Sequence, residues 1–127
     1  MTANSRKQRG SATENLLASY YKSRGWPYAE AVKAQGRDVT GMPGLAPEVK
    51  ARRGFDPLAW LRQAASNSDG DLPYVVFRPN GMGEKSIDSW GVVLRNEDFT
   101  TLLRAAGYGD PMLPDLENFS GKIGGAE

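Results

Sequence analysis

Hydrophobic residues follow two different spacings along the chain. Where they recur every three or four residues an amphipathic helix is predicted, and where they alternate or run together a strand is predicted. The helical spacing covers residues 11–25, 56–66 and 96–107, and the strand pattern covers residues 28–33, 38–50, 72–77 and 87–94. Because the segment 38–50 contains a turn and counts as two strands, the predicted order is α-β-β-β-α-β-β-α. A strand pair followed by a helical crossover to a parallel strand gives a mixed sheet flanked by helices, which is an α/β fold.

The boundaries of the first helix are indicated by residues at its two ends. Ser11 followed by Glu14 matches the capping-box pattern, in which the two side chains bond N–H groups of the first turn. Gly25 suits the C-terminal cap, and Pro27 prevents the helix from continuing. The first helix is therefore expected to begin at Ser11, after a polar and basic segment of residues 1–10.

Pro43-Gly44 is a strong turn dipeptide, because proline pre-sets one backbone dihedral and glycine accepts the other. If the chain turns back there, Asp38 lies opposite or diagonal to Glu48, with Cβ atoms roughly 5–8 Å apart. Glu48 and Lys50 are two residues apart, so a strand points both side chains to the same face. We therefore expect two carboxylates and one ammonium on one side of a small hairpin.

This cluster of charges predicts a metal site. Two carboxylates that lie close together repel each other unless something neutralises them, and Mg²⁺ does so with oxygen ligands. A bound metal polarises a phosphoryl oxygen and activates water, while a lysine beside it positions that water or offsets charge in the transition state. The chain has no cysteine and no histidine, which excludes disulfides, thiol or imidazole catalysis and typical zinc sites. A metal held by two carboxylates, with a lysine beside it, is the set of groups required for metal-dependent hydrolysis of a phosphodiester.

The same residues resemble a known family. Asp38 followed across a turn by Glu48-Val49-Lys50 resembles the motif of the PD-(D/E)xK nuclease superfamily. The fuller run from Arg37 to Lys50 is similar to small Holliday junction resolvase-like nucleases of phages and archaea, and the resemblance covers roughly residues 9–106. It implies a restriction-endonuclease-like mixed sheet flanked by helices, and Mg²⁺-dependent cleavage of branched DNA, with Mn²⁺ as a substitute metal. It also implies a homodimer, because a four-way junction is nicked at two symmetric positions.

The resemblance assigns roles to individual residues. Asp38, Glu48 and the backbone carbonyl of Val49 would bind the metal, and Lys50 would orient the attacking water or stabilise the transition state. Gln63, on the helix after the motif, matches a polar residue that many superfamily members point toward the site. The alternative for Gln63 is a surface side chain of that helix.

Two further residues have open interpretations. Glu14 matches the first-helix glutamate that faces the metal in many relatives, and it equally fits the capping box; one carboxylate does not serve both purposes with the same geometry. Pro47 departs from the family pattern, where a β-branched residue is more usual. Because proline has no N–H to donate to a neighbouring strand, Pro47 predicts an edge strand or a bulge.

Charge is uneven along the chain, although the net charge is only +1. Residues 1–109 hold 15 Lys and Arg against 11 Asp and Glu, an excess of +4, whereas the remainder holds one lysine and four acids. This excess permits a nucleic-acid partner. The candidate phosphate-binding residues, each also consistent with a solvated surface charge, are Arg6, Lys7, Arg9, Arg37, Arg52 and Arg53.

The expected organisation is a flexible basic arm, a nuclease-like domain and a flexible acidic tail, over residues 1–10, 11–107 and 108–127. The sequence contains no evident signal peptide or membrane span, so a cytoplasmic protein is expected, in the host cytoplasm if it is phage-encoded. Three alternatives to a resolvase stay open. One is a nuclease of the same type that acts on linear, flap or mismatched DNA, and another is a non-catalytic nucleic-acid-binding module with the same fold. The third is a purely structural small protein, against which the paired carboxylates beside a lysine argue.

Overall fold

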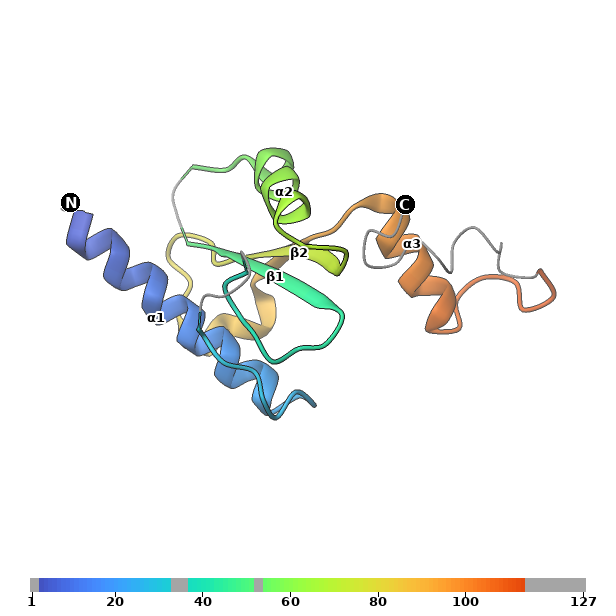
Figure 1. Cartoon of the computed structure of the whole chain (residues 1–127), viewed down its shortest axis with the longest axis horizontal. Coiled ribbons are helices and arrows are strands. Elements are labelled where there is room, and N and C mark those ends of the chain that lie inside the picture. The colour runs from blue at the N-terminus through green and yellow to red at the C-terminus, as the bar shows by residue number, and fades with distance from the viewer. Residues whose placement is uncertain (1–2, 33–36, 52–53, 114–127) are drawn as a thin grey trace.

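The structure, a computed structural model, describes residues 3–32, 37–51 and 54–113; for residues 3–11 it describes the backbone only. The helices are α1 (Ala3–Lys22), α2 (Pro57–Ser66), α3 (Asn96–Ala105) and a 3₁₀ helix, η1 (Glu84–Ser89). The strands are β1 (Leu45–Lys50), β2 (Leu72–Phe77) and β3 (Gly91–Val93). Together they form a mixed sheet flanked by helices (Figure 1), so the predicted α/β class is confirmed.

β2 is the central strand of this sheet. β1 runs parallel to it, from the Leu45–Leu72 pair to the Lys50–Phe77 pair, and β3 runs antiparallel to it on the other side. α2 connects β1 to β2, because two parallel strands need a crossover. The predicted helical crossover and the parallel pair are confirmed.

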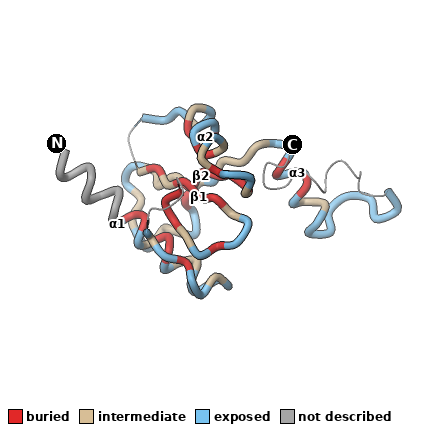
Figure 2. Tube along the Cα trace, viewed as in Figure 1, coloured by how far each residue is buried: buried red, intermediate tan, exposed pale blue. Residues whose placement is uncertain are grey.

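Two helices cover the sheet from opposite sides (Figure 1), and the buried residues gather in the two interfaces (Figure 2). Side chains alternate along β2: Tyr74 and Val76 pack in the cluster that contains Leu17 of α1, whereas Val75 packs with Trp60 of α2. Burial on both faces explains why β2 is a continuous apolar run rather than an alternating one.

The first two predicted strands, at 28–33 and at the start of 38–50, are wrong: the described residues before β1 form no strand. Over the described part of 28–33, Glu30 forms an isolated antiparallel bridge with Thr40, with N–H···O bonds of 3.0 and 2.9 Å in the two directions. Residue 33 lies outside the described residues. Burial alternates over residues 28–32, with Ala29 buried between exposed neighbours, but the single bridge does not extend into a ladder of strand pairs.

The last predicted strand is shorter than expected. β3 spans Gly91–Val93, and the first part of the predicted segment 87–94 belongs to η1 instead. Trp90 is buried and its Nε1 donates to the carbonyl oxygen of Gly83 at 3.2 Å, which folds the preceding residues back. Burial of Trp90 therefore decides where the chain enters the sheet.

The first helix begins earlier than predicted. α1 starts at Ala3, so Ser11 lies inside the helix and the capping box expected of Ser11 and Glu14 is wrong. A cap requires N–H groups without intrahelical partners, which exist only in the first turn. Alanine, arginine, lysine and glutamine residues before Gly10 favour the helix and outweigh that glycine.

α3 lies beyond the end of the sheet (Figure 1). Phe99 and Leu102, which lie at helical spacing on α3, are exposed because α3 follows β3 away from both core clusters. Arg104 donates to the carbonyl oxygens of Asp110 and Leu113, so the chain after α3 turns back along it. Residues 114–127 of the predicted tail lie outside the described residues. None of the helices in the described ranges is long and apolar enough to cross a membrane.

Candidate active site

Asp38 is attached to the free edge of β1 by two hydrogen bonds. Its backbone N–H donates to the carbonyl oxygen of Pro47 at 3.2 Å, and its carboxylate Oδ2 accepts from the backbone N–H of Val49 at 2.9 Å. The side chain is buried, with 7% of the residue's surface exposed. Asp38 therefore lies beside the end of β1, as the turn at Pro43-Gly44 predicted.

That turn has the geometry its sequence predicts. The N–H of Leu45 donates to the carbonyl oxygen of Met42 at 3.1 Å, and Gly44 has φ +80°. Proline followed by a residue with positive φ is typical of a type II β-turn. The turn is what brings Asp38 back alongside β1.

Pro47 is tolerated because it lies in an edge strand. The carbonyl oxygens of Gly44 and Lys50 accept bonds from the N–H groups of Leu72 and Arg78, so alternate positions of β1 face β2. The even-numbered residues of β1 face β2, and Pro47 lies between two of them. Its nitrogen therefore faces the free edge of the sheet, and no hydrogen bond to β2 is lost. The predicted edge placement of Pro47 is confirmed.

Lys50 is held between β1 and α2. Its Nζ donates to Oε1 of Gln63 at 2.9 Å and lies 4.0 Å from Oε1 of Glu48. Lys50 and Glu48 are both buried, with 6% and 8% of their surfaces exposed. Burial of an ammonium is costly unless charged or hydrogen-bonding groups compensate it, and Gln63 and Glu48 supply that compensation. The structure therefore brings together all three of these predicted residues.

The donor set fits a magnesium ion. Asp38 and Glu48 provide two buried carboxylates, and the carbonyl of Val49 leaves the strand on the same edge as the N–H that Asp38 accepts. Mg²⁺ is typically held by one or two carboxylates, with water and substrate phosphate completing the coordination. Over the described residues no group of three or more Asp, Glu, His or Cys side chains gathers at metal-ligand spacing. A magnesium ion held here would thus take two carboxylates and a carbonyl from the chain.

Glu14 is buried on the side of α1 that packs toward the sheet, and its role as a metal ligand stays a prediction. Its neighbour Thr13 is fully buried and accepts a hydrogen bond from Nη1 of Arg78 at 3.0 Å. The backbone N–H of Arg78 in turn donates to the carbonyl of Lys50 at 2.8 Å. Arg78 thereby connects α1 to the end of β1, a role that a lone arginine after an apolar strand does not reveal in sequence.

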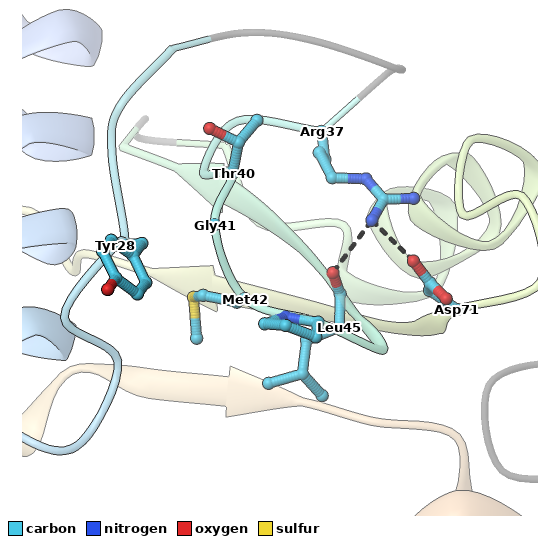
Figure 3. A pocket seen from close by; sticks show the side chains of 8 residues that line it. Tyr28, Arg37, Thr40, Gly41, Met42, Leu45 and Asp71 are labelled. Atoms are coloured by element: carbon cyan, nitrogen blue, oxygen red, sulfur yellow. Dashed lines mark hydrogen bonds and ion pairs between the residues drawn. The ribbon is translucent and has the colours of Figure 1, made fainter.

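Arg37 lines a pocket of about 410 Å³, where its side chain reaches Leu45 and Asp71 (Figure 3). Its Nη1 bonds the carboxylate of Asp71 at 2.7 Å and the carbonyl of Leu45 at 3.1 Å, and its Nη2 bonds the carbonyl of Ser68 at 2.8 Å. The guanidinium is buried and used within the protein, which argues against the phosphate contact predicted for Arg37. Arg37 instead anchors the segment that carries Asp38 to the start of β1 and β2.

Replacing Arg37 by methionine is expected to lower the free energy of unfolding by roughly 3 kcal/mol. This is the lower end of the range for breaking a buried ion pair, because Asp71 is partly exposed. Urea denaturation measures the effect. Arg24→Met is the matched control, because it breaks the ion pair between Arg24 and Asp88. Both of these side chains are more than half exposed, so the substitution should lower the free energy of unfolding by at most about 1 kcal/mol. Equal losses for the two variants would contradict the anchoring role.

Gly41 allows the same segment to pass close to Tyr28. A Cβ built on Gly41 collides with the backbone carbonyl of Tyr28, and Gly41 has φ +83°. Gly41→Ala is expected to lose roughly 3 kcal/mol or more of stability, from the strained dihedral and the overpacking together. Gly44→Ala is the control, since Gly44 has a similar φ with nothing within 4 Å of its Cβ and should lose about 1–2 kcal/mol. Thermal unfolding distinguishes the two, and equal melting temperatures would exclude the collision.

The structure describes no side-chain positions for the other residues predicted to contact DNA. Arg6, Lys7 and Arg9 lie on α1, in the part where only the backbone is described, and Arg52 and Arg53 lie outside the described residues. Their contacts with DNA stay predictions.

Comparison of the chain with models of known families, with curated proteins and with solved structures found no match in any of the three.

Proposed function

We propose that this protein is a Mg²⁺-dependent DNA endonuclease of the PD-(D/E)xK type, with branched DNA as its substrate. The observation that supports this most strongly is the bond from the Val49 N–H, between Glu48 and Lys50, to the Asp38 carboxylate, together with the contacts of Lys50 with Glu48 and Gln63. Asp38, Glu48 and Lys50 are buried, and the exposed Gln63 of α2 bonds the lysine from the side of the helix. Burial of so many charges is unfavourable for stability and is typical of a functional site.

Each residue has a distinct task in the proposed reaction. Asp38 and Glu48, with the carbonyl of Val49, would hold Mg²⁺, which when bound supplies Lewis-acid polarisation of the phosphoryl oxygen. Gln63 fixes the position of the Lys50 ammonium. Lys50 orients the attacking water toward phosphorus and offsets the negative charge that develops on the phosphate oxygens.

The finer assignments belong to the same proposal. The mixed sheet, with α1 and α2 on opposite faces and the site at the edge strand, agrees with a restriction-endonuclease-like fold. Four-way junctions are proposed because of the likeness of residues 37–50 to the resolvase-like nucleases. Symmetric nicking then calls for a homodimer with one site in each subunit, because each site cuts one strand.

Competition between substrates tests the junction assignment. A labelled immobile four-way junction is incubated with the protein and Mg²⁺ while unlabelled junction or linear duplex of the same sequence is added. We expect the unlabelled junction to suppress nicking at far lower concentrations than the linear duplex. Equal competition would leave the nuclease and remove the preference for junctions.

A further inference from the structure

A large aromatic side chain stands in solvent beside the proposed active site. Phe55, just before α2, is 65% exposed. Its ring meets Trp60 and Phe77 edge to face, with centroid separations of 5.5 and 5.3 Å. Phe55 is thus an exposed ring whose orientation is set by two neighbouring rings.

The rings that support Phe55 are fixed in place. Trp60 is buried on α2, and its ring centroid lies 6.1 Å from that of Phe77. The Phe77 ring occupies the space over Gly91 of β3, where a Cβ would collide with it. Phe55 therefore stands on a rigid aromatic base, and little conformational entropy is lost when it contacts a ligand.

Phe55 is on the same face of the sheet as the proposed catalytic lysine. Phe77 is the register partner of Lys50 on the neighbouring strand, so the two side chains point to the same side. On that side Lys50 bonds Gln63 of α2, and Phe77 packs with the α2 cluster. Phe55 thus contacts the ring of the residue that pairs with Lys50, although that ring lies over Gly91 of β3. A nucleic acid whose phosphate reaches Lys50 would extend over the same face of the sheet as Phe55.

We propose that Phe55 stacks on an unpaired or unstacked base at a DNA branch point and so selects branched DNA. The inference rests on the proposed nuclease function for the placement of DNA at Lys50. In a continuous duplex each base is already stacked on its neighbours, whereas a branch interrupts the stack and exposes a base face. Aromatic side chains bind such faces whatever the sequence, and they also insert between base steps that are opened.

Fluorescence of a base analogue tests the stacking directly. The probe is a synthetic four-way junction with 2-aminopurine at the branch point, and a linear duplex with the same base serves as the second substrate. Binding is measured in EDTA so that no strand is cut. Wild type and Phe55→Trp should change the 2-aminopurine fluorescence of the junction, whereas Phe55→Ala and Phe55→Leu should not. The two non-aromatic variants should bind the junction about tenfold or more weakly, with unchanged affinity for linear duplex.

Two comparisons separate stacking from packing. Phe55→Leu keeps an apolar cover over Trp60 and Phe77, and its thermal unfolding shows whether the fold is kept. Leu58→Ala removes a side chain that is also 65% exposed, but Leu58 lies five positions before Gln63 and on a different side of α2. It should bind both substrates as wild type does. Wild-type junction affinity in a folded Phe55→Leu variant, or an equal loss on linear duplex, would overturn the proposal.

The same samples keep this proposal separate from the nuclease proposal. Addition of Mg²⁺ measures cutting, which depends on Asp38 and Lys50. Junction binding that requires an aromatic residue at position 55, without any cutting, would support the stacking role and remove the catalytic one. Cutting that prefers junctions equally in wild type and Phe55→Leu would support the nuclease and overturn the role of Phe55.

Discussion

Lys50→Met is expected to reduce Mg²⁺-dependent cleavage of a four-way junction by about 10²- to 10³-fold, the usual effect of removing one group that stabilises developing charge. Methionine has a similar length and fills the same space between β1 and α2, but it donates no hydrogen bond to Gln63 and carries no charge. The loss should appear in kcat, since Lys50 is buried and, in the proposed mechanism, acts on the transition state more than on DNA binding. Single-turnover cleavage with excess protein measures it.

Lys22→Met is the matched control for this substitution. Lys22 is exposed in the last turn of α1, so its removal should leave the cleavage rate within a factor of about two, a difference of less than 0.5 kcal/mol in activation free energy. Circular dichroism and a thermal melt establish that Lys50→Met is folded. A folded Lys50→Met variant that cuts at the wild-type rate would exclude a catalytic role for the lysine.

Asp38→Asn is expected to abolish cleavage, with a loss of about 10³-fold or more. A metal ion contributes several kcal/mol to transition-state stabilisation, and each 1.4 kcal/mol or so corresponds to tenfold in rate. The substitution removes the carboxylate charge while the amide oxygen still accepts the bond from the N–H of Val49, so the connection to β1 survives. Raising the Mg²⁺ concentration should restore part of the activity, because a weakened site needs more metal.

Asp88→Asn is the corresponding control, since Asp88 is an exposed carboxylate on η1 far from β1 in the sequence. It should cut the junction as wild type does. Electrophoretic mobility shifts in EDTA establish that Asp38→Asn still binds DNA. Equal loss of cleavage in the two aspartate variants would point to general electrostatics rather than to a metal site.

The parts of the fold that follow from local sequence were predictable. Asp56 caps α2 by accepting from the N–H of Ala59 at 3.3 Å, and Pro57 is the first residue of that helix, as both residue types indicate. The apolar run at residues 72–77 predicted the strand that the structure shows as β2. Lengths that depend on tertiary packing were not predictable: β3 is short because the burial of Trp90 ends η1 directly before it.

For the candidate site, too, the features set by local sequence were predictable and those set by tertiary packing were not. The Pro43-Gly44 turn fixes which residues lie beside β1, so the neighbourhood of Asp38 and Glu48 follows from sequence. The inward position of Arg37 does not, because its partners Ser68 and Asp71 lie more than 30 residues further along the chain. Nothing local distinguishes a buried arginine from a phosphate-binding one.

The measurement that tests the central claim most directly is the mapping of strand cuts on an immobile four-way junction, with wild type and Asp38→Asn, in Mg²⁺ and in EDTA. Denaturing gels resolve the position of every nick. We expect paired nicks at symmetric positions that require Mg²⁺, are absent in EDTA and are lost in Asp38→Asn. Absence of cutting by folded wild-type protein with Mg²⁺ or Mn²⁺ would contradict the assignment of Asp38, Glu48 and Lys50 as a nuclease site.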